Sequence, residues 1–170
     1  MTYSKDIIFD AQQLLETICP VNLLLIGSSI ESIANNYISQ CESIHRSCYV
    51  NTIDASNKLS HDYYNQRYDL VIIADLLESC SKQHAQQLLA KTRNLCSPKV
   101  ILLATLNDQW SKNELLALGL IQFAEYTDPN RQENLKSVLY QYNIDTYKKT
   151  PDWFSPKNWA NPELWDKFWW

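Results

Sequence analysis

The chain has 170 residues, with 15 lysines and arginines against 19 aspartates and glutamates, and a formal net charge of -4. This length fits one compact domain of ordinary size. Only 2 residues are glycine, which excludes a P-loop and a complete three-glycine dinucleotide fingerprint, because both motifs need glycines at fixed, close spacing. Lysine and arginine form no cluster, so we expect no nucleic-acid partner.

The apolar runs are too short to cross a membrane. The most apolar ones, 21–27 and 100–106, fall far below the roughly 20 residues of a membrane span, and we expect no membrane partner. Lys5, Asp6 and Asp10 interrupt the start of the chain, which argues against a signal peptide and favours a cytoplasmic location. The 5 cysteines include no C-x-x-C pair, so we expect reduced, buried thiols with neither disulfides nor a metal site.

The first part of the chain alternates between helix and strand patterns. We expect a helix at 4–18 capped by Ser4, a strand at 21–26, a helix at 30–41 and a strand at 48–53. Ser28 and Glu31 have the spacing of a capping box, which predicts that Glu31 folds back onto the start of the second helix. Residues 55–67 are polar and loop-like.

The second part continues the alternation and ends in two strands. We expect a strand at 68–74, a helix at 81–95 with Leu95 inward, strands at 100–105, 120–126 and 135–144, and a short helix after Ser111. Ser111 and Glu114 form a capping box, and Gly119 closes that helix with a positive φ. The order predicts an α/β fold: a doubly wound, mainly parallel sheet with helices on both faces and a C-terminal antiparallel hairpin at its edge.

Three segments carry a resemblance to a known family. Residues 23–29 (Leu-Leu-Leu-Ile-Gly-Ser-Ser) form a strand and loop, and Asp54 ends the next strand. Residues 68–78 (Tyr-Asp-Leu-Val-Ile-Ile-Ala-Asp-Leu-Leu-Glu) form a central strand followed by acidic residues. Together with the closing hairpin they resemble a class I S-adenosylmethionine-dependent methyltransferase domain. The end of the chain is similar to a small bacterial family of uncharacterised proteins with a methyltransferase-like core.

The resemblance implies S-adenosylmethionine as cofactor and methyl transfer to an unknown small-molecule or protein acceptor. It assigns Gly27, Ser28 and Ser29 to the methionine part of the cofactor, Asp54 to the ribose and Asp75 to the region of methyl transfer. It implies no metal and names no catalytic residue.

The first loop departs from the pattern of that family. The family has an acidic residue followed by three alternating glycines, whereas here Leu25 replaces the acid and Ser29 and Glu31 replace two glycines. A carboxylate at Glu31 would use the positive helix end that an anionic ligand group otherwise uses. Two hypotheses therefore stay open: a methyltransferase that binds S-adenosylmethionine, and a non-catalytic interaction protein of the same fold.

Several polar residues have a structural and a functional interpretation. Asp54 is placed to bind ribose hydroxyls, but an aspartate also begins many solvated turns. Asp75 and Glu78 follow the central strand, where α/β sheets bind ligands, although Glu78 also leads into the next helix. Cys80 and His84 have the spacing of a thiol–imidazole pair, but a surface histidine beside a partly buried cysteine is the simpler interpretation.

A Trp-rich extension at 151–170 follows the domain at 1–150. Its Asn161, Pro162 and Glu163 predict the start of a short helix. It has three possible roles: a latch on its own domain, a lid over the strand ends, or an interface with another protein or with a second copy in a homodimer. Its aromatic residues are Trp153, Phe154, Trp159, Trp165, Phe168, Trp169 and Trp170.

Overall fold

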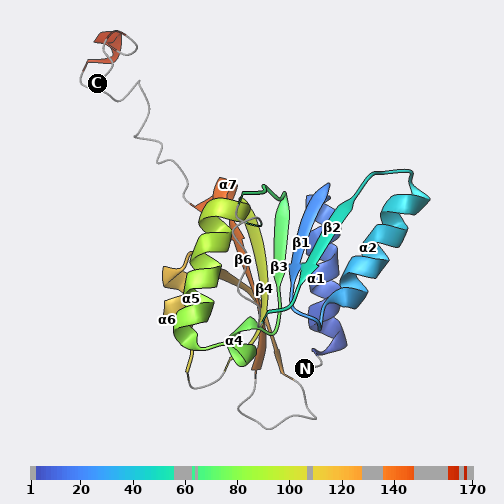
Figure 1. Ribbon diagram of the computed structural model, residues 1–170. Helices are drawn as coiled ribbons and strands as arrows, with labels where there is room; N and C mark the ends of the chain where they lie inside the picture. Colours follow the sequence, from blue (N-terminus) through green and yellow to red (C-terminus); the bar gives the residue numbers. More distant parts are fainter. Residues whose placement is uncertain are drawn as a thin grey trace.

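The computed structural model describes residues 3–55, 63, 65–106, 109–127, 136–147, 161–164 and 167 (Figure 1). The strands are β1 (Asn22–Ile26), β2 (Tyr49–Ile53), β3 (Leu70–Ile73), β4 (Lys99–Leu106), β5 (Ile121–Thr127) and β6 (Lys136–Asn143). The α-helices are α1 (Lys5–Ile18), α2 (Glu31–Ser43), α4 (Leu76–Ser79), α5 (Lys82–Lys91), α6 (Lys112–Ala117) and α7 (Ile144–Tyr147). The shorter helical turns are η1 (Thr92–Cys96) and η3 (Pro162–Leu164).

The six strands form one sheet in the order β2-β1-β3-β4-β6-β5. β2, β1, β3 and β4 are parallel, whereas β6 runs antiparallel to both β4 and β5. This confirms the mainly parallel sheet and the closing hairpin. Within this hairpin the antiparallel strand β6 lies inside the sheet, and β5 forms the edge. Burial explains the order, because Val138, Leu139 and Tyr140 of β6 are buried while Ile121 and Phe123 of β5 are exposed.

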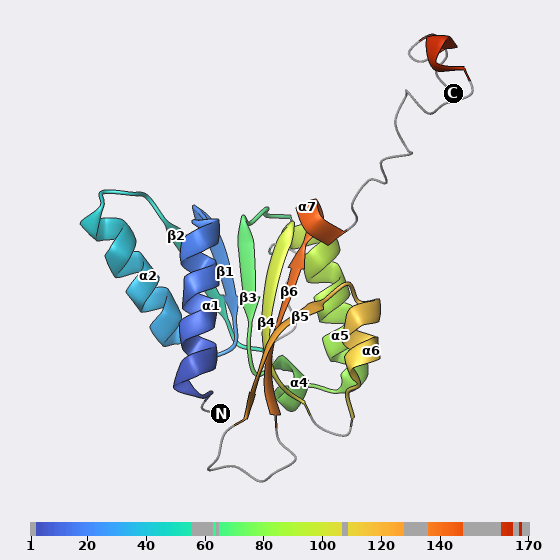
Figure 2. The ribbon, with the colours of Figure 1, turned by 180° about the vertical axis from the view of Figure 1, so that it is seen from behind.

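Helices cover both faces of the sheet. α1 and α2 pack on the face seen in Figure 2, and α4, α5 and α6 pack on the face seen in Figure 1. In α1 the buried residues Ile7, Ala11 and Leu15 recur every four positions, which places them on one side of the helix. Each face has its own apolar cluster, and the two clusters are separated by the sheet.

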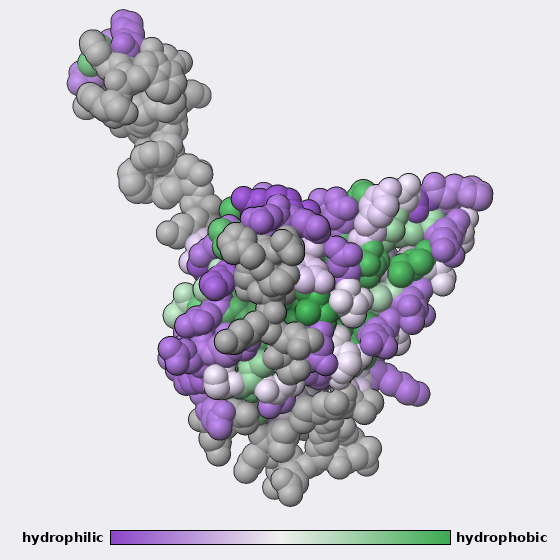
Figure 3. Space-filling view, in the orientation of Figure 1, coloured by the Kyte–Doolittle hydropathy of each residue, from purple (hydrophilic) through white to green (hydrophobic). Residues whose placement is uncertain are grey.

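The face seen in Figure 3 shows hydrophobic residues at its surface. They lie between α5 and α2, over β1 and β2. Tyr49 on the edge strand β2 is 66% exposed. The polar segment 55–67, expected to be a loop, contributes no strand in its described residues.

Two local expectations were wrong. α2 begins at Glu31 with Ile30 as its N-cap and has no side-chain hydrogen bond at that cap, so the predicted capping box between Ser28 and Glu31 is not formed. α5 ends at Lys91 and continues as the π-helical turn η1, in which Leu95 is 45% exposed. A π turn is wider than an α turn, which rotates Leu95 off the face that a regular helix would bury.

The predicted ends of α6 are confirmed. Ser111 Oγ accepts from the Glu114 backbone N–H, and the Glu114 carboxylate accepts from the Ser111 N–H at 3.0 Å, so this capping box is complete. Gly119 has φ +85° after α6.

Ser4 stands at the N-cap of α1, but its side chain forms no cap hydrogen bond. In the tail the expected helix start is a single 3-10 turn, η3; the aromatic residues of the tail lie outside the described residues.

Candidate functional site

The residues singled out from the sequence meet at one edge of the sheet. Gly27 follows β1, Asp54 follows β2 and Asp75 follows β3, and parallel strands end on the same side. The Gly27 N–H donates to the Ile53 carbonyl at 2.8 Å, which holds the ends of β1 and β2 together. The structure therefore brings Gly27, Ser28, Ser29, Asp54 and Asp75 to the edge where open α/β sheets bind ligands.

The carboxylate of Asp75 reaches across to the loop after β1. Its oxygens accept from the Ser29 backbone N–H at 3.0 Å and from the Ser29 hydroxyl at 2.7 Å. Asp75 is 8% exposed and has φ +59°, a left-handed conformation that an aspartate adopts only with local support. Both hydrogen-bond donors of Ser29 are thus occupied by a side chain of the same protein.

The N-terminal segment completes this network. The Tyr3 hydroxyl donates to the Leu103 carbonyl at 3.1 Å and accepts from the Asp75 backbone N–H at 3.1 Å. Tyr3 is itself buried, beside the start of α1. Tyr3 is not recognisable from the sequence as part of the site, because nothing in a helix-flanking tyrosine indicates a partner 72 positions away.

Gly27 has a structural role that needs no ligand. Its φ is +113°, and a Cβ added there would lie 2.4 Å from the Ala74 carbonyl oxygen and 3.3 Å from the Asp75 carboxylate. The loop after β1 therefore packs directly against the end of β3. Glycine is required because the two backbones approach so closely.

Glu78 ties α4 to β4. One carboxylate oxygen accepts from the Thr105 backbone N–H at 2.7 Å, while the other is buried without a hydrogen-bond partner. Burial raises the pKa of Glu78 above its ordinary value, and the hydrogen bonds from Thr105 partly offset this. The side chain faces β4 and bridges protein groups, as a structural carboxylate does.

Cys80 and His84 do not form the reactive pair considered from their spacing. The Cys80 thiol donates to the Ala55 carbonyl at 3.2 Å, and burial followed by the charge of Asp54 raises its pKa. Nε2 of His84 is buried without a hydrogen-bond partner. A protonated thiol bonded to a carbonyl is a poor nucleophile. In the described part of the chain, no group of three or more potential ligands could hold a metal ion.

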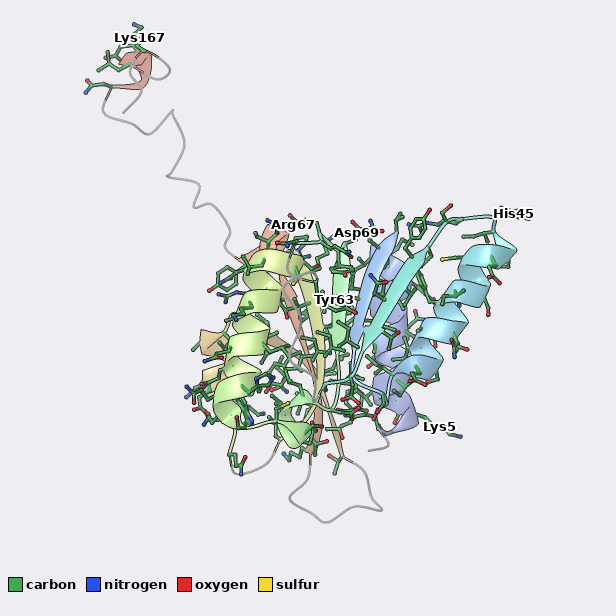
Figure 4. All side chains as sticks on the ribbon, viewed as in Figure 1. Lys5, His45, Tyr63, Arg67, Asp69 and Lys167 are labelled. Carbon is green, nitrogen blue, oxygen red and sulfur yellow. The ribbon has the colours of Figure 1, made fainter. Side chains whose placement is uncertain are left out.

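Asp69 links two strands at the other end of the sheet, as Asp75 links β3 to the loop after β1. Its carboxylate accepts from the Val21 and Asn22 N–H groups at 2.8 and 2.9 Å and so fastens the start of β1 to the start of β3. Figure 4 shows Asp69 far from Lys5, which marks the end where the candidate site lies. Within the segment 68–78 the two aspartates thus serve opposite ends of one strand.

The fold is similar to that of known methyltransferases. Magnesium protoporphyrin IX methyltransferase from Synechocystis PCC 6803, solved with bound S-adenosylmethionine, aligns with TM-score 0.51 and 12% identity over 81% of this chain and 78% of its own. The CMeT domain of the citrinin polyketide synthase aligns with TM-score 0.56 and 8% identity over 81% of this chain and 52% of its own, about half its length.

A protein from Rhodobacter sphaeroides named for a zinc-dependent alcohol dehydrogenase aligns equally well. Its TM-score is 0.51 with 11% identity, over 82% of this chain and 90% of its own. At such identities the likeness establishes a methyltransferase-like fold and leaves the reaction open.

A family model covers nearly the whole chain. The model described as "Family of unknown function (DUF6231)" matches residues 6–170. The chain belongs to this family. A search of curated proteins found no match. In the described residues of this family member, no helix is both long and apolar enough to cross a membrane.

The polar groups at the strand ends fit S-adenosylmethionine poorly. The methionine part of that cofactor ends in a carboxylate, which needs hydrogen-bond donors such as those of the loop after β1. Both hydrogen-bond donors of Ser29 are bonded to the Asp75 carboxylate. That carboxylate lies beside Gly27, where the cofactor would approach. Asp54, which is exposed at the end of β2, keeps the placement that a ribose would require.

Proposed function

We propose that this family member is a non-catalytic protein of methyltransferase-like fold that acts by binding another protein. The observation that carries the proposal is the bond between Asp75 and Ser29. It replaces a ligand at the strand ends with a side chain of the chain itself.

The energetics support a closed site. Asp75 and Ser29 form a charge-assisted hydrogen bond and a second bond to a backbone N–H, and a hydrogen bond to a charged group contributes about 1.5–3 kcal/mol. Tyr3 holds the Asp75 backbone from the other side. A ligand that needed Ser29 would have to break these bonds and would leave a buried carboxylate without its donors.

The role in protein binding rests on composition. Of the 6 tryptophans, all but Trp110 lie in the C-terminal extension, and tryptophan is strongly favoured at the centres of protein interfaces. No comparable concentration of aromatic residues occurs elsewhere in the sequence. The extension is therefore the proposed contact surface.

A second candidate function is the binding of S-adenosylmethionine with methyl transfer to an unknown acceptor. The position of Asp54 favours it, because this carboxylate is exposed directly beside Gly27, at the end of the neighbouring strand. In this alternative Asp75 would turn away from Ser29 and face the sulfonium group, whose positive charge a carboxylate stabilises.

Titration calorimetry with S-adenosylmethionine and S-adenosylhomocysteine separates the two candidates. We expect no heat and no thermal shift at millimolar ligand for the wild type. The variant Asp75→Ala, with Ser29→Ala as a control that retains the aspartate, tests whether the carboxylate closes the site. Binding by the wild type at micromolar ligand would overturn the proposal and support the methyltransferase.

A further inference from the structure

Apolar side chains are exposed at the end of the sheet opposite to the candidate site. This end surface lies where the parallel strands begin, beside α7, and Figure 1 shows α7 and α4 at opposite ends. It is formed by Leu95 (45% exposed), Leu116 (58%), Ile121 (45%), Ile144 (56%) and Tyr147 (40%).

The backbone links these side chains to one another. The Ile144 N–H donates to the Pro98 carbonyl at 3.0 Å, three positions after Leu95. A Cβ added at Gly119 would lie 3.1 Å from the Tyr147 ring, and the Gly119 N–H donates to the Leu116 carbonyl at 2.8 Å. Ile121 follows two residues later, at the start of β5. The surface therefore belongs to one region of the fold.

A shallow recess with a cavity volume of about 10 Å³, room for about one water molecule, opens within this region. Aliphatic side chains line it. The Arg93 guanidinium lies over the Tyr142 ring, 5.5 Å from the ring centroid, so one wall of the recess carries a positive charge. The recess is too small for an aromatic ring, so a docking ring would contact the exposed apolar side chains around it. The residues lining it are Leu89, Arg93, Val100, Leu118, Leu120 and Tyr142.

The Trp-rich tail starts at this surface. The chain continues directly from Tyr147. Residues 153–170 carry the aromatic residues with two acidic and two basic residues, so their side chains have no net charge. At about 150–250 Å² for each large ring, its rings offer roughly 1,000–1,800 Å² of surface. A stable interface needs about 800 Å² from each partner, so the tail suffices for one.

We propose that two copies of the chain associate by exchanging tails, each tail docking on the end surface of the other copy. The proposal rests on the binding role argued above and names a second copy as the partner. The exchange is symmetric, as in most homodimers, and gives two equal contacts.

The sequence of the tail favours a second copy over the chain's own surface. The end surface surrounds the root of the tail, so docking within one chain requires a tight reversal soon after Tyr147. Residues 148–170 contain no glycine and have prolines at 151, 156 and 162. Proline favours extended chain, and glycine is the residue that tight reversals prefer. From this composition we expect the tail to reach a neighbour more readily than its own root.

Light scattering on the eluting full-length chain, from about 1 to 100 µM, tests the exchange. We expect twice the monomer mass, falling on dilution. A tail variant (Trp165→Ser, Phe168→Ser, Trp169→Ser) and a surface variant (Leu95→Asp, Ile144→Asp) should each be monomeric. Phe9→Asp on α1, where Phe9 is 60% exposed, is the matched control and should remain dimeric.

Mixing the two monomeric variants identifies the exchange itself. The tail variant keeps its end surface and the surface variant keeps its tail, so one of the two contacts can form. We expect a heterodimer that dissociates at least tenfold more readily than the wild type. Unchanged urea midpoints for each variant confirm that both remain folded.

Three outcomes would overturn the exchange: a monomeric wild type with tail tryptophans protected from acrylamide, which indicates a latch; a dimer that survives both sets of substitutions; and a dimer lost with Phe9→Asp. Binding of S-adenosylmethionine would overturn the non-catalytic role and leave these measurements unaffected, so the two failures are distinguishable.

Discussion

Replacing Gly27 by alanine should destabilise the protein without any ligand. The new Cβ would lie 2.4 Å from the Ala74 carbonyl oxygen and 2.9 Å from its carbon, and both are backbone atoms of a strand end that cannot move aside cheaply. The φ of +113° adds strain, because it lies outside the regions open to residues with a side chain.

The magnitude follows from these two effects. Backbone strain in a sparsely populated region costs about 1–3 kcal/mol, and overpacking costs about 1–3 kcal/mol more. We expect Gly27→Ala to lower the free energy of unfolding by about 4 kcal/mol. In a chain of this size that corresponds to a fall of roughly 8–16 °C in the melting temperature.

Gly119→Ala is the matched control for this prediction. Gly119 also has a positive φ, +85°, but its added Cβ would meet side-chain atoms of Arg93, Tyr147 and Tyr142 at 2.9–3.3 Å. These can shift, so we expect a loss of about 1–2 kcal/mol, mainly from strain. Urea denaturation with unchanged slopes measures both variants. A loss for Gly27→Ala no larger than that for Gly119→Ala would refute the explanation.

Three further predictions concern side chains. Tyr3→Phe should cost about 1–3 kcal/mol, because it leaves the Asp75 N–H and a strand carbonyl buried without partners; chemical denaturation measures it. Lys82 lies 2.6 Å from the Glu114 carboxylate and lowers its pKa to about 2. This ion pair therefore stabilises the folded state above pH 4.5, and the stabilisation is lost as the pH falls toward 2. In the variant Lys82→Met the urea midpoint should depend less on pH across that window. Burial raises the pKa of Glu78, which penalises folding as the pH rises through its titration, so Glu78→Gln should raise the midpoint at pH 7 and have no such benefit at pH 4.

Much of the architecture is predictable because it depends on local patterns. The buried run of β3 and the amphipathic face of α1 are read from neighbouring residues, as is the capping box at Ser111. The wrong expectations concern the loop before α2 and the end of α5, where the backbone departs from the regular geometry that the local pattern predicts. A capping box at Ser28 has the correct spacing, but the bond from Ser29 to Asp75 sets the path of that loop.

The sequence by itself determined the alternation of helix and strand, the edge where Gly27, Asp54 and Asp75 meet, and the loss of glycines from the first loop. Tertiary structure decided what those residues do there. Ser29 and Asp75 are 46 positions apart and Tyr3 and Asp75 are 72 apart. They meet only because β1, β3 and β4 align in register, and long-range register is a property of the assembled sheet that no local pattern contains.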